Sequence, residues 1–192
     1  MTGYWEMSDI TFITGNQNKA DFLAKYLGIE IKHHKLDLDE IQSLDPHEVV
    51  EHKVRQAYDI LHSPVLVEDA GLSFTALGRL PGTFVKWFID EIGYQGLLEL
   101  AYSLPEQTAV GHVTYGLYDG KEIHFFDGEM RGRIAKEAHD GGMGFGFDPI
   151  FINDGYDKTR AQMTEEEYAR TSYRTPAMDK LRVFLTNGQS SL

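Results

Sequence analysis

The segment Gly142–Phe151 constrains the fold of this chain more than any other stretch, because it reads Gly-Met-Gly-Phe-Gly-Phe-Asp-Pro-Ile-Phe. So many glycines disfavour a helix, and so many phenylalanines are unusual in a solvated linker. Glycine lets a backbone approach a flat ligand closely. Phe145 and Phe147 offer rings to stack on such a ligand, and Asp148 can accept hydrogen bonds from a base or a ribose. A strand–turn–strand unit with a structural glycine bulge explains the same residues equally well.

Length and composition are those of a globular protein. The chain has 192 residues, which predicts one domain or one two-lobed domain over residues 1–192. Hydrophobic residues make up 42% and charged residues 25%, the ordinary balance for a protein with a buried core. The sequence has no cysteine, so disulfides and thiolate metal sites are excluded. This composition fits a reducing compartment, and we expect a cytoplasmic protein.

The charge and the hydropathy pattern exclude several classes of partner. The formal charge of −12 argues against duplex nucleic acid, which binds positively charged surfaces. No apolar run approaches the length of a membrane span, so we expect no membrane partner. Met1–Asp9 has neither a basic region nor a long apolar run, so we expect no secretory signal. A small anionic ligand remains compatible, because it needs only a local group of lysines and arginines or a metal ion.

The order of apolar patterns predicts a mixed α/β fold that begins with strand–helix units and has a strand-rich middle. Asn16 is placed to cap the first helix and Gly28 to end it. Asp119-Gly120 predicts a hairpin, and Arg79–Gly82 a turn. The predicted strands are Ile10–Ile13, Ile29–Leu38, Pro64–Val67, Ala109–Tyr118 and Glu122–Ile134, and the predicted helices are Ala20–Leu27, Asp45–Leu61, Phe84–Ile92, Gly96–Ser103, Thr164–Arg170 and Pro176–Leu185.

The turn Thr14–Lys19 is a candidate phosphate site, because it lies where a strand ends and a helix begins. Unpaired amides and the positive end of the helix dipole favour an anion there, and Lys19 adds a full charge. The turn is not a Walker A loop, because it lacks the Gly-Lys-Ser/Thr ending. A capped helix with a solvated lysine is the alternative.

Two acidic groups are candidate metal ligands. Asp37, Asp39 and Glu40 follow one predicted strand, and Glu68-Asp69 follow another. The ends of strands often meet at one edge of an α/β sheet, and carboxylate oxygens from two strands suit Mg²⁺. Each group alone is equally explained as a solvated loop.

Single basic residues complete the set of candidates. Lys53 and Lys86 each lie near a glycine or carboxylate group of interest. Arg174, in the C-terminal segment, is able to donate a fork of hydrogen bonds to a keto oxygen or a phosphate. The alternative for each is an ordinary solvated side chain.

Five segments, taken in order, resemble the inosine triphosphate pyrophosphatase family of house-cleaning hydrolases. The resemblance extends from about Thr11 to Leu185. The matching segments are Thr14-Gly15-Asn16 with Lys19, Glu68–Leu72, Leu80–Gly82 with Lys86–Phe88, Gly144–Pro149, and Lys158-Thr159 with Ala161–Met163.

The resemblance implies an elongated α/β fold with a long central mixed sheet, two lobes and a nucleotide cleft between them. It implies hydrolysis of inosine, deoxyinosine or xanthosine triphosphate to the monophosphate and pyrophosphate. It also implies a Mg²⁺ cofactor, with Mn²⁺ as a substitute, and a homodimer.

Roles follow for individual residues. The triphosphate is expected to bind Thr14, Gly15, Asn16, Asn18 and Lys19, with Lys53 and Lys86 balancing its charge. Mg²⁺ is expected on Glu40 and Asp69, with Glu68 alongside, and Asp69 is expected to help a water attack the α-phosphorus. The base and sugar are expected against Phe145, Gly146, Phe147 and Asp148, and near Tyr168, Tyr173 and Arg174.

One segment departs from the family pattern. Tyr168, Ala169 and Tyr173 stand where the family has lysine, asparagine and histidine, and Gln162 stands where it has glutamate. Arg174 is kept. Stacking tolerates any base, so we expect looser base selectivity, or selectivity for a modified or pyrimidine base. A nucleotide-binding protein without turnover is a further alternative, against which the kept carboxylates and lysines argue.

Overall fold

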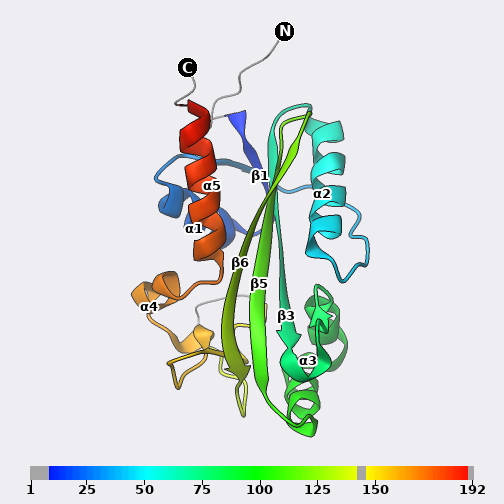
Figure 1. Cartoon of the computed structure of the whole chain (residues 1–192), viewed down its shortest axis with the longest axis vertical. Helices are drawn as coiled ribbons and strands as arrows, with labels where there is room; N and C mark the ends of the chain where they lie inside the picture. The colour runs from blue at the N-terminus through cyan, green and yellow to red at the C-terminus, as the bar shows by residue number, and fades with distance from the viewer. Residues whose placement is uncertain (1–8, 142–145, 190–192) are drawn as a thin grey trace. The chain divides into compact units, whose positions relative to one another are not determined.

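The structure is a computed structural model and describes residues 9–141 and 146–189 (Figure 1). In this part of the chain, five α-helices accompany a mixed sheet of seven strands, which confirms the predicted α/β class. The strand order is β2-β1-β3-β5-β6-β7, and β4 pairs with β3. No helix within the described ranges is both long and apolar enough to cross a membrane.

The elements have the following bounds. The strands are β1 (Thr11–Ile13), β2 (Lys32–His34), β3 (Val65–Phe74), β4 (Pro81–Gly82), β5 (Thr108–Tyr118), β6 (Ile123–Ile134) and β7 (Phe151–Asn153). The α-helices are α1 (Gln17–Leu27), α2 (Pro46–Leu61), α3 (Val85–Ser103), α4 (Glu165–Arg170) and α5 (Arg174–Gln189), and the short 3₁₀ helices are η2 (Thr75–Leu77) and η3 (Arg160–Gln162).

The chain divides into two compact units. The first unit comprises the described residues up to Asp69, the segment Thr114–Asp127, and the described residues from Pro176. The second unit comprises Ala70–Val113 and the described part of Gly128–Thr175.

In the first unit, β1 pairs in parallel with both β2 and β3, so that Thr11 lies opposite Lys32 on one side and Val65 on the other. The helices α1 and α5 lie on one side of these strands and α2 on the other (Figure 1). Tyr26 Oη donates to Asp179 Oδ1 over 2.9 Å, which joins α1 to α5.

The predicted caps of the first helix are confirmed, and the second helix begins where it was predicted. Asn16 accepts a hydrogen bond from the amide of Lys19, and Gly28 ends α1 with a left-handed φ of 69°. Asp45 accepts from the amide of His47 at the start of α2, where Pro46 fits because a first-turn residue has no intrahelical N–H bond to lose.

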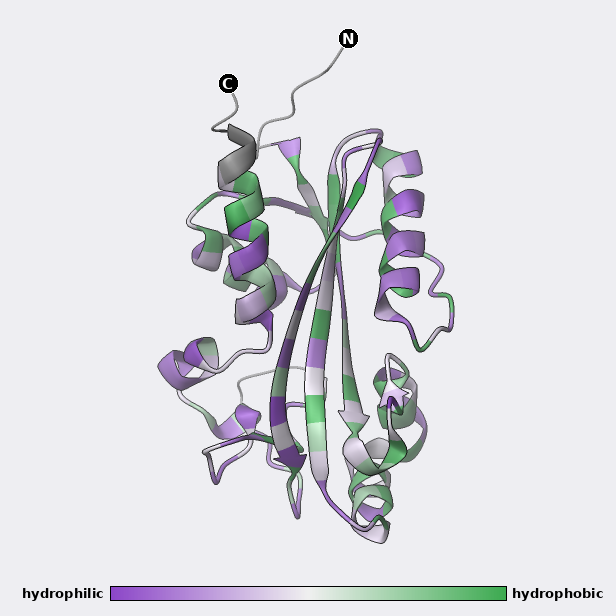
Figure 2. Ribbon diagram, in the orientation of Figure 1, coloured by the Kyte–Doolittle hydropathy of each residue, from purple (hydrophilic) through white to green (hydrophobic). Residues whose placement is uncertain are grey.

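The core of the first unit lies between α2 and the sheet. Figure 2 shows the apolar residues of α2 on the side that faces the strands. Val50 and Val54 are fully buried there, and each such side chain contributes about 1.5–3 kcal/mol through its burial. Gly116 on β5 allows this contact, because a Cβ at that position would lie 2.2 Å from Val50 Cγ1.

Two predicted strand bounds are wrong. The strand predicted over Ile29–Leu38 is only Lys32–His34; Leu36 and Leu38 alternate because they pack on the core as loop residues. The strand predicted to end at Val67 continues to Phe74, so Glu68 and Asp69 lie inside β3. Charged residues suggested a strand end, but lysines from the neighbouring helices neutralise them within the strand.

In the second unit, β4 pairs antiparallel with β3 and β7 antiparallel with β6. The predicted turn at Arg79–Gly82 is therefore partly strand, since Pro81 and Gly82 form β4. The two helices predicted over residues 84–103 are joined as α3 with a break at Gly93, whose φ of 65° and ψ of −178° are not helical. Neither β7 nor η3 was predicted.

Candidate active site

The turn before α1 has the local structure of an anion site. Thr14 Oγ1 accepts from the amide of Asn16 over 3.1 Å, and Asn16 Oδ1 accepts from the amide of Lys19 over 3.4 Å. A Cβ on Gly15 would lie 3.1 Å from Lys35 Cδ, so the stem of Lys35 covers the turn. Asn18 is exposed on the first turn of the helix. The structure thus places Thr14–Lys19 in one capped turn and adds Lys35, whereas Lys53 and Lys86 lie elsewhere.

Lys19 is joined to the sheet by an ion pair. Its Nζ lies 2.6 Å from Glu68 Oε1, and the Glu68 side chain is only 3% exposed. Neighbouring residues of a strand point to opposite faces, so Asp69 faces the other way. Glu68 therefore belongs with α1 and the turn before it.

A second lysine holds the other two predicted carboxylates. Lys53 Nζ, from α2, lies 2.9 Å from Asp69 Oδ1 and 2.8 Å from Glu40 Oε1. Gln56, one turn further along α2, accepts from the amide of Asp39 and donates to its carbonyl oxygen, which fixes the loop that carries Glu40. The structure thus brings Glu40 and Asp69, which were predicted to share a metal ion, together around Lys53.

Burial and charge act against each other in this group. Burial lowers the pKa of Lys53, but the charges and hydrogen bonds of Asp69 and Glu40 outweigh it and raise that pKa above its ordinary value. Burial, with the charges of Glu40 and Glu68, raises the pKa of Asp69 despite the opposing charge and hydrogen bond of Lys53. The oxygen Asp69 Oδ2 is buried and has no hydrogen-bond partner. Buried polar atoms are nearly always paired, so this oxygen marks a position for a ligand.

The predicted metal ligands do not form one cluster. Glu40 and Asp69 share Lys53, whereas Glu68 pairs with Lys19. Across the residues that the structure describes, no three His, Asp or Glu side chains lie close enough together to hold an ion. Two of the three predicted ligands therefore remain together.

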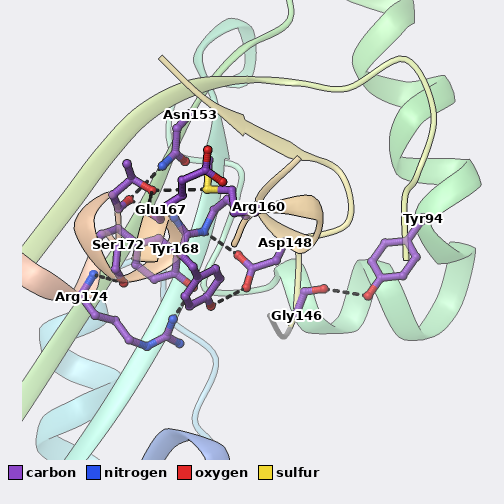
Figure 3. Close-up of polar contacts among 12 residues, drawn as sticks. Tyr94, Gly146, Asp148, Asn153, Arg160, Glu167, Tyr168, Ser172 and Arg174 are labelled. Carbon is purple, nitrogen blue, oxygen red and sulfur yellow. Dashed lines mark hydrogen bonds and ion pairs between the residues drawn. The ribbon is translucent and has the colours of Figure 1, made fainter. Parts of the chain in front are cut away.

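In the second unit, Asp148 is the centre of a buried polar cluster. Arg160 Nε donates to its Oδ1 over 2.9 Å, and Tyr168 Oη donates to its Oδ2 over 2.8 Å (Figure 3). Arg160 and Asp148 are fully buried. Arg160 Nη1 donates to the carbonyl oxygen of Thr171, whereas Nη2 is buried without a partner. Asp148, predicted to bind the base or sugar directly, has protein partners on both oxygens, and its contact with a nucleotide stays a prediction.

Tyr173 and Arg174 extend this cluster. Arg174 Nη1 donates to Tyr173 Oη over 2.8 Å, and the ring of Phe147 stacks on that of Tyr173 with centroids 5.4 Å apart. Gly111 on β5 lies against both rings, because a Cβ there would lie 3.3 Å from Phe147 and 3.4 Å from Tyr173. The structure thus brings together four predicted base-site residues, Phe147, Asp148, Tyr168 and Tyr173, with Arg174.

Two further predicted residues, Gly146 and Lys86, lie apart from these groups. The carbonyl oxygen of Gly146 accepts from Tyr94 Oη over 2.7 Å, which joins Gly146 to α3 (Figure 3). Lys86 is exposed near the start of α3, with Nζ 5.5 Å from the centre of the Trp87 ring. Phe145 lies outside the described residues.

Sequence reasoning missed Lys35 and Arg160. Lys35 carried no motif, because its place beside Gly15 depends on the pairing of β2 with β1. Arg160 had one available signal: it lies within the segment Lys158–Met163 that resembles the family, where the only position singled out was Gln162.

A match to a family model shows the family of this chain. Residues 10–184 match the model of the Ham1 family. The chain belongs to the Ham1 family. This confirms the resemblance that five short segments indicated, over nearly the same residues.

Curated relatives match over almost their whole length. The inosine triphosphate pyrophosphatase of Scheffersomyces stipitis is 39% identical, with 94% of this chain and all of that protein covered. The dITP/XTP pyrophosphatase of Thermococcus kodakarensis is 37% identical, with 88% of this chain and 92% of that protein covered.

A solved family structure has the same fold. The HAM1 protein of Coxiella burnetii superposes with a TM-score of 0.81 at 27% identity, covering 93% of this chain and 98% of that one. The Ham1 protein of Staphylococcus aureus gives a TM-score of 0.80 at 26% identity, with the same shares covered. The mixed α/β architecture is thus that of the family.

Proposed function

We propose that this protein hydrolyses non-canonical purine nucleoside triphosphates to the monophosphate and pyrophosphate. The family relatives that match nearly the whole chain carry the names inosine triphosphate pyrophosphatase and dITP/XTP pyrophosphatase. The observation in this chain that carries the proposal is the buried pair of Lys53 and Asp69, with Asp69 Oδ2 left without a partner.

The first unit supplies groups suited to a triphosphate. The positive end of the dipole of α1 favours negative charge. Lys19 lies in the first turn of this helix, and the stem of Lys35 crosses the preceding turn. We assign phosphate binding to Thr14–Lys19 and Lys35, with Lys86 as a further predicted contact.

Residues present in the first unit fit a Mg²⁺ ion, with Mn²⁺ as a substitute. Asp69 Oδ2 lacks a partner, and Glu40, whose side chain is 44% exposed, offers a second carboxylate on the same lysine. Oxygen ligands of this kind are those that Mg²⁺ takes. When bound, such an ion supplies Lewis acidity and neutralises phosphate charge. We assign Glu40 and Asp69 as its ligands and keep Glu68 with Lys19.

In the proposed reaction, a water attacks the α-phosphorus. A new bond forms between the water oxygen and that phosphorus, the bond from the phosphorus to the oxygen bridging to the β-phosphate breaks, and pyrophosphate leaves. Asp69 orients the water and accepts a hydrogen bond from it. Lys53 holds Asp69 in place and, with Lys19, stabilises the charge that develops.

The second unit carries the residues assigned to the base, around Asp148 and Tyr173. The tyrosines that replace lysine and histidine also favour a second candidate, the same reaction on a wider range of bases. The cytoplasmic location and the homodimer stay predictions.

A pyrophosphate-release assay tests the proposal. It measures hydrolysis of inosine, deoxyinosine, xanthosine and the common nucleoside triphosphates, each with Mg²⁺, with Mn²⁺ and with a chelator. We expect rapid, metal-dependent release from the deaminated purines. Release of orthophosphate instead of pyrophosphate, or no release from any nucleotide, contradicts the proposed function.

A further inference from the structure

The loop that carries Glu40 is held by the side chain of Gln56. This loop leads from β2 to α2 and runs beside α2 before it enters the helix (Figure 1). Gln56 Oε1 accepts from the amide of Asp39 over 3.1 Å, and Gln56 Nε2 donates to the carbonyl oxygen of the same residue over 3.0 Å. One side chain thus bonds both backbone groups of the residue before Glu40, as a neighbouring antiparallel strand would.

The direction of these two bonds is set by their partners. The amide of Asp39 only donates, so it requires the oxygen of the Gln56 side chain. Gln56 Nε2 also lies 2.7 Å from His52 Nδ1, and because Nε2 only donates, Nδ1 is the acceptor. His52 Nδ1 lies 3.3 Å from the carbonyl oxygen of Asp39, so both side chains face one peptide group. A reversed Gln56 amide would place two donors together at the Asp39 amide.

The same loop is also held by apolar packing and by an ion pair. Leu38 packs on the buried core cluster between α2 and the sheet. Asp39 is fixed through its backbone, and Glu40 then reaches Lys53, with Oε1 2.8 Å from Nζ. Lys53 lies three residues before Gln56, on the same side of α2. The helix therefore holds the loop at two consecutive residues.

Glu40 needs such support more than its partner carboxylate does. Its side chain is 44% exposed, and it lies in a loop outside the helices and strands. A ligand on a loop loses conformational entropy when it binds an ion, unless the loop is already ordered. Asp69 lies within β3, which orders it. Residues that orient a metal ligand from outside are typically worth 10- to 100-fold in metal affinity.

We propose that Gln56 is a positioning residue for Glu40 as a metal ligand. By pairing with both backbone groups of Asp39, Gln56 holds the Glu40 carboxylate where it shares Lys53 with Asp69. This inference deepens the proposed function and rests on it, because it takes Glu40 as a ligand of the divalent ion.

Binding of Mn²⁺ alone, without nucleotide, tests the inference independently of turnover. Electron paramagnetic resonance measures unbound Mn²⁺ in titrations of the unaltered protein and of Gln56→Met, which keeps the length of the side chain but neither hydrogen bond. We expect the variant to bind Mn²⁺ at least about tenfold more weakly. In pyrophosphate release, the Mg²⁺ concentration for half-maximal activity is expected to rise by the same factor, and kcat to recover at saturating Mg²⁺.

A double-mutant cycle separates positioning from a general structural role. Glu40→Gln removes the charge of the ligand itself and is expected to weaken Mn²⁺ binding at least as much. If Gln56 acts through Glu40, Gln56→Met added to Glu40→Gln weakens binding no further, because residues that act together are not additive. Gln95→Met is the matched control, since Gln95 donates to Glu99 on its own helix in the second unit. It is expected to leave Mn²⁺ affinity unchanged.

Two results overturn the inference. One is equal Mn²⁺ affinity in the unaltered protein and Gln56→Met. The other is a pair of losses that multiply in the double variant, as they do for independent residues. If Gln56→Met does not fold, the cycle is repeated with Gln56→Ala, because alanine has the highest helix propensity.

Failure of the inference is distinguishable from failure of the proposed function. Metal-dependent release of pyrophosphate, with unchanged Mn²⁺ affinity in Gln56→Met, overturns the inference and leaves the function in place. Weaker Mn²⁺ binding by Gln56→Met, in a protein that releases no pyrophosphate from any nucleotide, contradicts the function and leaves the positioning role in place.

Discussion

The two polar groups of this protein use buried charge differently. Around Lys53 in the first unit, one lysine is shared by two carboxylates, one of them 44% exposed, and a buried oxygen of Asp69 has no partner. Around Asp148 in the second unit, both carboxylate oxygens accept hydrogen bonds from fully buried or nearly buried donors. The first group keeps a carboxylate oxygen that a ligand can bind. In the second group, both carboxylate oxygens are used in hydrogen bonds within the protein. Damage to the first is therefore expected to stop chemistry, and damage to the second to weaken the fold and the choice of base.

The largest expected effect is on turnover. Asp69→Asn keeps the shape of the side chain but removes the charge that a metal ion or an attacking water needs. We expect kcat to fall by at least about 10²-fold on every nucleotide, with little change in the ratio between bases. Steady-state kinetics at saturating Mg²⁺ measure this. Near-normal activity contradicts the assignment of Asp69.

The next effect is on stability. Arg160→Met leaves the carboxylate of Asp148 buried without its ion pair, and breaking such a pair destabilises a protein by about 3–5 kcal/mol. Arg55→Met is the matched control, because its pair with Glu51 is about half exposed and is worth at most about 1 kcal/mol. Urea unfolding compares the two variants. An equal, small loss of unfolding free energy in both variants contradicts the role given to the buried pair of Arg160 and Asp148.

A smaller effect concerns substrate affinity. Lys19→Ala removes a charge from the first turn of α1 and leaves Glu68 to repel phosphate, so we expect triphosphate binding to weaken by about tenfold or more. The loss shrinks at high salt, where screening already weakens the contact. Lys25→Ala, on the same helix, is the control. A changed preference between inosine and adenosine triphosphates in Lys19→Ala contradicts the assignment of this region to phosphates. Lys53→Ala is expected to weaken triphosphate binding in the same way.

The smallest effect is a pH dependence within the second unit. A hydrogen bond from Lys158, then one from the backbone at Thr164, lowers the pKa of Glu167 from 4.5 to about 2. A carboxyl whose pKa is lower in the folded state stabilises above its ordinary pKa, and this stabilisation is lost as the pH falls from 4.5 through about 2. Glu167→Gln is therefore expected to lower Tm at neutral pH and to match the unaltered protein below about pH 2. A difference in Tm that does not change with pH contradicts the pairing of Glu167 with Lys158. Glu166→Gln is the control.

Much of the fold was predictable because local patterns encode it. Asn16, Gly28, Asp45 and Pro46 mark the ends of α1 and α2 through backbone hydrogen bonds that adjacent residues satisfy. The hairpin between β5 and β6 follows from Asp119, which accepts from the amides of Lys121 and Glu122. These hydrogen bonds join residues that are close together in the chain, so the sequence determines them without tertiary contacts.

The meeting of Glu40 with Asp69 was expected from the ends of two predicted strands and from the family resemblance, but no local pattern predicts that Lys53 joins them. Three separate segments supply these residues, and the contact exists because α2 packs against the sheet. The division of Glu68 from Asp69 is likewise tertiary, since it depends on β3 continuing through both residues.

The roles of the tyrosines were decided by tertiary structure alone. The sequence determined that lysine and histidine are replaced by Tyr168 and Tyr173, and from this we expected loosened selectivity. A hydroxyl group donates or accepts according to its partner. The partner of Tyr168 is Asp148, 20 residues away. The partner of Tyr173 is its neighbour Arg174, within the same buried cluster. Sequence thus determined which groups are present, and packing determined in which direction each one bonds.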